Sequence, residues 1–118
     1  EIYTLSLHDA LPIWLISFWT ALQYSETFEY TAGMSSSFFW EDQFMIREVE
    51  RRGCQGLRYY IDSGSPNDNA DVTRLMRDKL DELGCTFEHV EETGGTHDWS
   101  FWKGRFPNVL RTFEQSHR

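Results

Sequence analysis

Three strand-like segments alternate with helix-like segments along the chain, and this order restricts the possible folds more than any other feature. Strands are predicted at 28–34, 57–62 and 86–91, and helices at 14–24, 41–52, 72–83 and from 98 onward. A strand, a helix and a further strand in one sheet require crossover connections, which join parallel strands. We therefore predict an α/β fold with about three parallel strands and flanking helices.

The helical segments differ in how clearly their ends and faces are marked. The segment 14–24 is apolar on every side, which predicts a helix that is covered on all faces. Asn69 or Asp71 can cap the start of the helix at 72–83, and Gly84 is suited to its end. The last helix is predicted to restart at Pro107, because proline is favoured in a first turn.

Composition excludes several classes of function. The 118 residues are enough for one small domain, and the net charge is -8, with 19 acidic against 11 basic residues. Nucleic-acid binding is not expected, because it depends on neutralising phosphates. The longest apolar run, Leu11 to Leu22, is shorter than the roughly 20 residues that cross a bilayer, so we expect no membrane partner. The compartment, whether cytoplasmic, periplasmic or extracellular, stays open.

The two cysteines, Cys54 and Cys85, have neither the spacing of a zinc site nor the density of a disulfide scaffold. Each precedes a predicted strand, so a bridge between them is geometrically conceivable. We interpret both as small buried side chains.

Two loops at the carboxyl ends of the second and third strands carry ionisable groups. In a parallel sheet these ends share one edge, where α/β proteins place their sites. His97 can accept and return a proton near neutral pH, and Asp68 in the neighbouring loop can orient its ring. Asp62 and Asp71 are rival acids. A purely structural role for His97 and Asp68, as helix caps, is an equal alternative.

The stretches from Tyr60 to Asp71 and from Gly94 to Lys103 carry a family resemblance. The second contains Gly-Gly-Thr-His-Asp-Trp-Ser-Phe-Trp, and the sequence from Leu15 to Phe113 resembles the C-terminal part of an α/β-hydrolase esterase family. This family includes esterase D-like, feruloyl esterase-like and enterochelin esterase-like proteins. By position, the resemblance implies that His97 is the general base and Asp68 the triad acid. It implies a small-molecule ester substrate and no metal or organic cofactor, and it leaves the oligomeric state open.

The same resemblance indicates that a nucleophile is missing. Members of the fold carry a G-x-S-x-G turn ahead of a buried helix, and no such motif occurs in this sequence. Segment 14–24 is similar to the helix that follows that turn. Residues 1–13 do not fit the family and resemble translated sequencing-adapter read-through. We therefore expect a non-native extension at 1–13, and at 14–118 the C-terminal portion of a serine esterase domain that is inactive alone.

One serine offers an alternative nucleophile. Ser35 lies in Gly33-Met-Ser-Ser-Ser37 after a predicted strand, and it precedes Asp68 and His97 in the order that the fold requires. Ser37, however, replaces the second glycine of the motif, and the buried helix precedes the turn. We interpret Ser35 as a polar turn residue.

The aromatic residues suggest a second class of function, a non-catalytic module that binds a carbohydrate or an aromatic ring. Trp99, Trp102 and Phe106 share one face of the last predicted helix. We interpret this stripe as core packing. Phe39 and Trp40, after the first strand, are better placed to line a substrate pocket.

Overall fold

The structure, a computed structural model, describes residues 10–116 of the chain. Most of the expected extension at 1–13 lies outside the described residues. The elements in chain order are α1 (Ala10–Gln23), β1 (Tyr30–Met34), α2 (Trp40–Arg52), β2 (Arg58–Ser65), α3 (Ala70–Glu82), β3 (Thr86–Thr93) and α4 (Trp99–Ser116).

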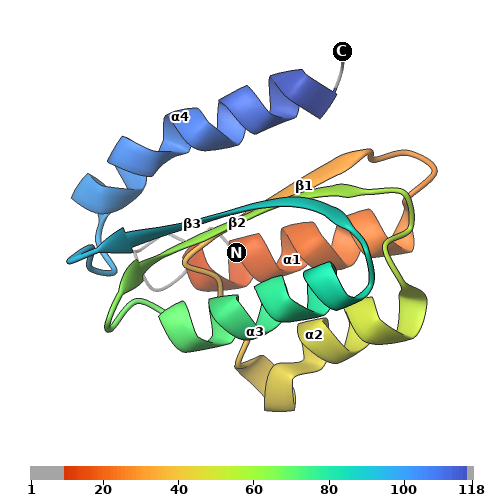
Figure 1. The fold of residues 1–118 in the computed structure, drawn as a ribbon, viewed down its shortest axis with the longest axis horizontal. Helices are drawn as coiled ribbons and strands as arrows, with labels where there is room; N and C mark the ends of the chain where they lie inside the picture. The colour runs from red at the N-terminus through yellow and green to blue at the C-terminus, as the bar shows by residue number, and fades with distance from the viewer. Residues whose placement is uncertain (1–9, 117–118) are drawn as a thin grey trace, which may run out of the picture.

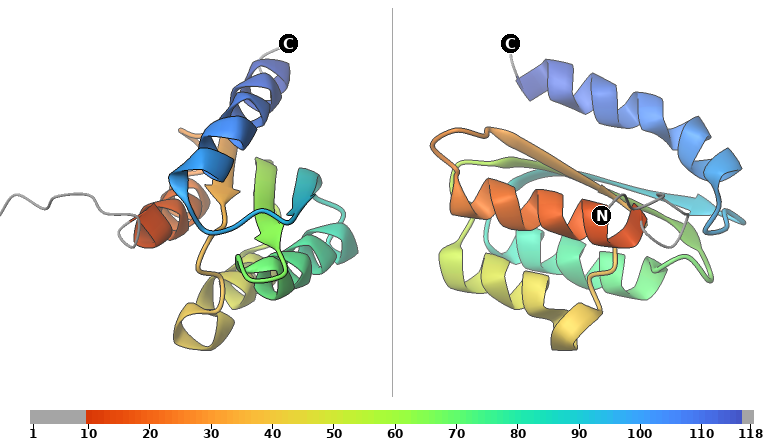
Figure 2. Two further views of the ribbon diagram at one scale, coloured as in Figure 1. Left: turned by 90° about the vertical axis from the view of Figure 1, so that its left-hand side faces the viewer. Right: turned by 180° about the vertical axis from the view of Figure 1, so that it is seen from behind.

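The three strands form one parallel sheet in the order β1-β2-β3. Helices α1, α2 and α3 cover one face of this sheet, and α4 lies across the other (Figure 1). The two further views in Figure 2 show the same arrangement. The α/β fold class predicted from the alternating segments is therefore confirmed.

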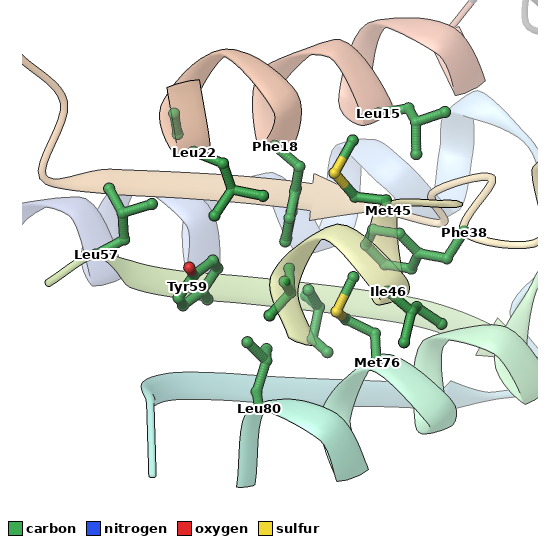
Figure 3. Close-up of a cluster of buried hydrophobic side chains, with 13 residues drawn as sticks. Leu15, Phe18, Leu22, Phe38, Met45, Ile46, Leu57, Tyr59, Met76 and Leu80 are labelled. Atoms are coloured by element: carbon green, nitrogen blue, oxygen red, sulfur yellow. The ribbon is translucent and has the colours of Figure 1, made fainter. Parts of the chain in front are cut away.

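The larger core lies between the sheet and helices α1, α2 and α3. Phe18 packs edge to face on Phe38 with the ring centroids 5.1 Å apart, and both rings are buried beside Tyr59 (Figure 3). Gly33 on β1 suits the close approach of α1 to the sheet, because a Cβ at this position would lie 3.0 Å from the ring of Phe18, closer than ordinary van der Waals contact. Strand β1 is buried from its second residue onward, so it is covered on both faces. Phe28, which the alternating pattern placed in this strand, lies outside it and is exposed.

Helix α1 departs from the prediction that it is covered on all faces. Ile16 and Trp19 are 60% and 42% exposed, so that prediction is wrong for these two residues. Both side chains line an open groove of about 950 Å³ between α1 and α2, which also involves Phe39 and Trp40. A uniformly apolar helix predicts burial on every face, but it does not identify the segment that packs against each face.

Three local features of α3 and α4 refine the sequence predictions. Helix α3 is followed by Gly84 with φ 76°, as expected. Asn69 occupies the N-cap position, but its side chain makes no capping bond and instead donates to the carbonyl of Ser35 at 2.8 Å. The predicted restart at Pro107 is wrong, because α4 runs without a break from Trp99 to Ser116.

Cys54 and Cys85 form a disulfide, with their Cα atoms 5.3 Å apart. Our interpretation of both as small buried side chains, in preference to a bridge, is therefore wrong. The two residues precede β2 and β3, which are neighbours in the sheet, so the same parallel order that joins the carboxyl ends of these strands also brings their amino ends together.

Helix α4, with 18 residues, is the longest helix in the described part of the chain. Within residues 10–116, no helix combines the length and the apolar character that crossing a bilayer requires.

Candidate functional site

The candidate site is built by two loops at the carboxyl edge of the sheet. The loop after β3 contacts the end of β2, because the amide of Gly94 donates to the carbonyl of Ser65, the last residue of that strand, at 2.9 Å. Gly64 permits this contact, since a Cβ at this position would overlap the backbone of Gly95. The first turn of α1 lies at the same edge (Figures 1 and 2).

Asp68 and His97 meet where the two loops touch. Oδ1 of Asp68 is hydrogen-bonded to Nδ1 of His97, and the amide of Gly64 donates to Oδ2 of Asp68 at 2.8 Å. The Asp68 side chain is fully buried, whereas the His97 side chain is 23% exposed. The imidazole also packs edge to face on Trp102, with the ring centroids 4.6 Å apart. These contacts fix the position and the plane of the ring.

The second ring nitrogen of His97 differs from the first, because none of the described residues is hydrogen-bonded to it. Nε2 is shielded from solvent and makes no hydrogen bond to any residue among 10–116. A ring that is held through Nδ1 by a carboxylate and has a free Nε2 is the arrangement in which a histidine takes a proton from a hydroxyl.

Neither rival acid is hydrogen-bonded to His97 within the described residues. The side chain of Asp71 is 92% exposed and pairs with Arg74. Asp62 is fully buried and accepts a hydrogen bond from the Tyr60 hydroxyl at 2.7 Å. Burial raises the pKa of Asp62 to about 6, against the opposing effect of Arg105. Of the three acids considered, Asp68 is the one whose carboxylate is hydrogen-bonded to the histidine.

Ser35 is also part of the site, but it contacts the acid. Its backbone has φ 51°, its side chain is fully buried, and Oγ donates to Oδ2 of Asp68 at 2.5 Å. Oγ also lies 3.2 Å from Nε1 of Trp102 and 3.0 Å from Nη2 of Arg105, both of which donate to it. No hydrogen bond joins Ser35 to His97 within the part of the chain that the structure describes.

Sequence reasoning missed Arg105. Its side chain is 3% exposed and lies among three carboxylates, with Nε 3.2 Å from Asp62, Nη2 3.5 Å from Asp68 and Nη1 2.8 Å from Glu92. The signal in the sequence was its spacing, because 102, 105 and 109 share one helical face and the other two residues are apolar. A cation on such a face is buried only if carboxylates surround it.

The aromatic stripe on α4 is not core packing as a whole. Trp102 is buried, but Trp99 and Phe106 are 66% and 45% exposed, so the interpretation fails for these two residues. Phe39 and Trp40 line the groove between α1 and α2. Among the described residues, no group of three or more His, Cys, Asp or Glu side chains could hold a metal ion.

Comparisons with known proteins support the fold. The structure is similar to a solved ferulic acid esterase, with a TM-score of 0.69 and 16% sequence identity over 81% of this chain. The matched region is 45% of the esterase chain, so this chain spans about half the length of that protein. At this identity the likeness shows an esterase-like fold. No protein-family model and no curated protein matches the sequence.

Proposed function

We propose that this chain carries the base and the acid of a serine carboxylic-ester hydrolase, with His97 as general base and Asp68 as the acid that orients it. The observation that carries the proposal is the Asp68–His97 hydrogen bond at the carboxyl edge of the sheet, with Nε2 of His97 unbonded among residues 10–116. The fold shared with a ferulic acid esterase favours ester hydrolysis over the other reactions that such a pair can serve.

Each residue has a defined part in this proposal. Nε2 of His97 takes the proton from an attacking serine hydroxyl, returns it to the leaving alcohol, and then activates the water that releases the acyl group. Asp68 keeps the ring oriented and stabilises the imidazolium as it forms. No step of this mechanism calls for a metal or an organic cofactor.

The nucleophile of this proposal lies outside the sequence. Ser35 donates its proton to the acid, and the sequence contains no G-x-S-x-G turn. A serine delivered at the start of α1 would stand at the carboxyl edge of the sheet, where β3 ends (Figure 1), and His97 lies in the loop that follows β3. The 118 residues would therefore be the C-terminal portion of a longer esterase and would be inactive alone.

The first experiment uses the 118-residue chain itself. We expect no turnover of 4-nitrophenyl acetate above the level of the His97→Ala variant, and no labelling by a fluorophosphonate, which reacts with activated serines. Labelling or turnover that disappears in Ser35→Ala would make Ser35 the nucleophile and would refute this proposal.

The second experiment joins residues 14–118 in frame to the coding sequence that precedes them in the gene. We expect turnover that falls by roughly 10⁴-fold or more in His97→Ala and by about 10⁴-fold in Asp68→Asn. Asp71→Asn is the matched control, since Asp71 is exposed and lies only three residues from Asp68, and its turnover should be unchanged. An active extended protein that tolerates His97→Ala would contradict the assignment.

A further inference from the structure

We propose that Ser35 is a positioning residue, whose hydroxyl keeps Asp68 ionised and thereby keeps the hydrogen of the neutral His97 ring on Nδ1. The inference deepens the proposed function, since a base must present a lone pair on Nε2. The hydrogen position itself is a property of the folded chain, and it can be tested without any esterase activity.

The direction of the Ser35 hydrogen bond follows from its partners. A hydroxyl has one proton to donate and two lone pairs that accept. Nε1 of Trp102 and Nη2 of Arg105 are donors only, so both must donate to Oγ, at 3.2 and 3.0 Å. The single proton of Ser35 is then left for Oδ2 of Asp68, which lies 2.5 Å away.

This arrangement determines the charge on Asp68. Its Oδ2 accepts from the Ser35 hydroxyl and from the amide of Gly64 at 2.8 Å, and the Arg105 guanidinium lies 3.5 Å from the same oxygen. Hydrogen bonds and a nearby cation all favour the ionised carboxyl. An ionised carboxyl has no proton to give, so Nδ1 of His97 must be the donor in the bond to Oδ1.

A competing arrangement of the Asp68–His97 pair contains the same number of protons. In it, Asp68 carries the proton on Oδ1 and donates to Nδ1, while the ring hydrogen sits on Nε2. Such a ring could not accept a proton from an attacking hydroxyl through Nε2. Removing the donors to Oδ2 weakens the ionised form of Asp68 and so favours this competitor.

The backbone of Ser35 gives independent support. Its φ of 51° lies in the left-handed region, which is strained for a residue with a Cβ and open to glycine. The turn is held by its own bonds, since the amide of Ser35 donates to the carbonyl of Asp62 at 2.8 Å and Asn69 donates to the carbonyl of Ser35. The turn itself therefore needs no hydroxyl, whereas Asp68 does.

The test compares Ser35→Gly with Ser36→Ala. Glycine suits the left-handed backbone at 35, so the variant should fold while lacking the hydroxyl. Ser36 is the matched control, because it is the neighbouring serine, is fully buried, and has an Oγ without a hydrogen-bond partner among residues 10–116. Circular dichroism and the thermal midpoint of each variant establish that it is folded.

The readout is the ¹⁵N and ¹H spectrum of the His97 ring in its neutral form, assigned with His97→Gln. We expect the wild type and Ser36→Ala to show a slowly exchanging hydrogen on Nδ1. In Ser35→Gly we expect this signal to be lost or replaced by a mixture of both hydrogen positions. A wild-type ring with its hydrogen on Nε2, or a Ser35→Gly spectrum equal to the wild type, would overturn the inference.

The two proposals can fail separately. A Ser35→Gly response as expected, in a gene product that shows no esterase activity at its full length, would support this inference and refute the proposed function. An active enzyme whose His97 ring does not respond to Ser35→Gly would support the proposed function and refute this inference.

Discussion

Nε of Arg105 lies 3.2 Å from Oδ2 of Asp62 in the interior of the molecule, where Asp62 is fully buried and Arg105 is 3% exposed. Nη2 of the same guanidinium lies 3.5 Å from Asp68. One cation therefore faces two buried carboxylates, and the pair that holds α4 to the sheet is also the electrostatic support of the candidate acid. Removing a partner from such a group leaves a buried charge uncompensated, which costs far more than the net value of the pair.

Arg105→Met should therefore destabilise the chain by roughly 3–5 kcal/mol, measured as the free energy of unfolding in urea. Arg111→Met is the control, because Arg111 also lies on α4 and pairs with a carboxylate, Glu88, but is 47% exposed. Its loss should cost less than about 1 kcal/mol. Equal costs for the two variants would mean that the buried cluster is not held by charge.

The raised pKa of Asp62 predicts how the stability of the folded chain depends on pH. Burial raises its pKa in the folded state to about 6. A raised carboxyl pKa means that the folded state binds this proton more tightly than the unfolded chain does. The stabilisation of the folded state by the bound proton is fully present below the unfolded pKa and is lost as pH rises through the folded pKa. The loss in free energy of unfolding is on the order of 3 kcal/mol.

Asp62→Asn lacks this titration. The cost of the substitution, measured by urea unfolding against the wild type, should therefore be larger at about pH 4 than at about pH 7, by on the order of 3 kcal/mol. Asp71→Asn, which removes an exposed carboxylate, should show little such difference. A cost that is constant with pH, or larger near neutral pH, would contradict the raised pKa.

That an acid and His97 would lie at one edge of the sheet could be predicted from topology, whereas the choice of Asp68 over Asp62 and Asp71 came from the family resemblance. Asp68 and His97 follow strands that are neighbours in a parallel sheet, and such strands end at one edge. The same logic was available for Cys54 and Cys85, which precede the same two strands. The interpretation went wrong there because it gave the number and spacing of the cysteines more weight than their positions before two neighbouring strands.

Ser35 and Arg105 could not be predicted in the same way. The contact of Ser35 with Asp68 requires a left-handed backbone at a residue other than glycine, and no local sequence pattern indicates this conformation. The role of Arg105 depends on three carboxylates from β2, β3 and a loop. These carboxylates become neighbours of Arg105 only when α4 packs on the sheet. Both are properties of packing between distant segments.

The disulfide predicts a measurable effect of reduction. Cys54 and Cys85 are 31 residues apart, and closing a loop of this length stabilises the folded state by about 3–4 kcal/mol in the chain-entropy model. We expect a thiol reductant to lower the urea midpoint of the wild type accordingly, and to leave the Cys54→Ala, Cys85→Ala double variant unchanged. A wild-type midpoint that does not respond to reduction would show that the bridge is not formed.

Gly64 links the fold to the site, because its missing side chain lets the loop after β3 reach the loop after β2. A Cβ in Gly64→Ala would overlap the backbone of Gly95, which can yield only by moving the loop that carries His97. We expect a loss of roughly 1–3 kcal/mol in stability together with loss of the His97 Nδ1–H signal. Gly104→Ala on α4 is the matched control. Its Cβ would meet nothing within 4 Å, so helix propensity should stabilise the chain by about 0.5–1 kcal/mol with the ring signal intact. If Gly64→Ala retained the signal at wild-type stability, the contact between the two loops would not be what positions His97.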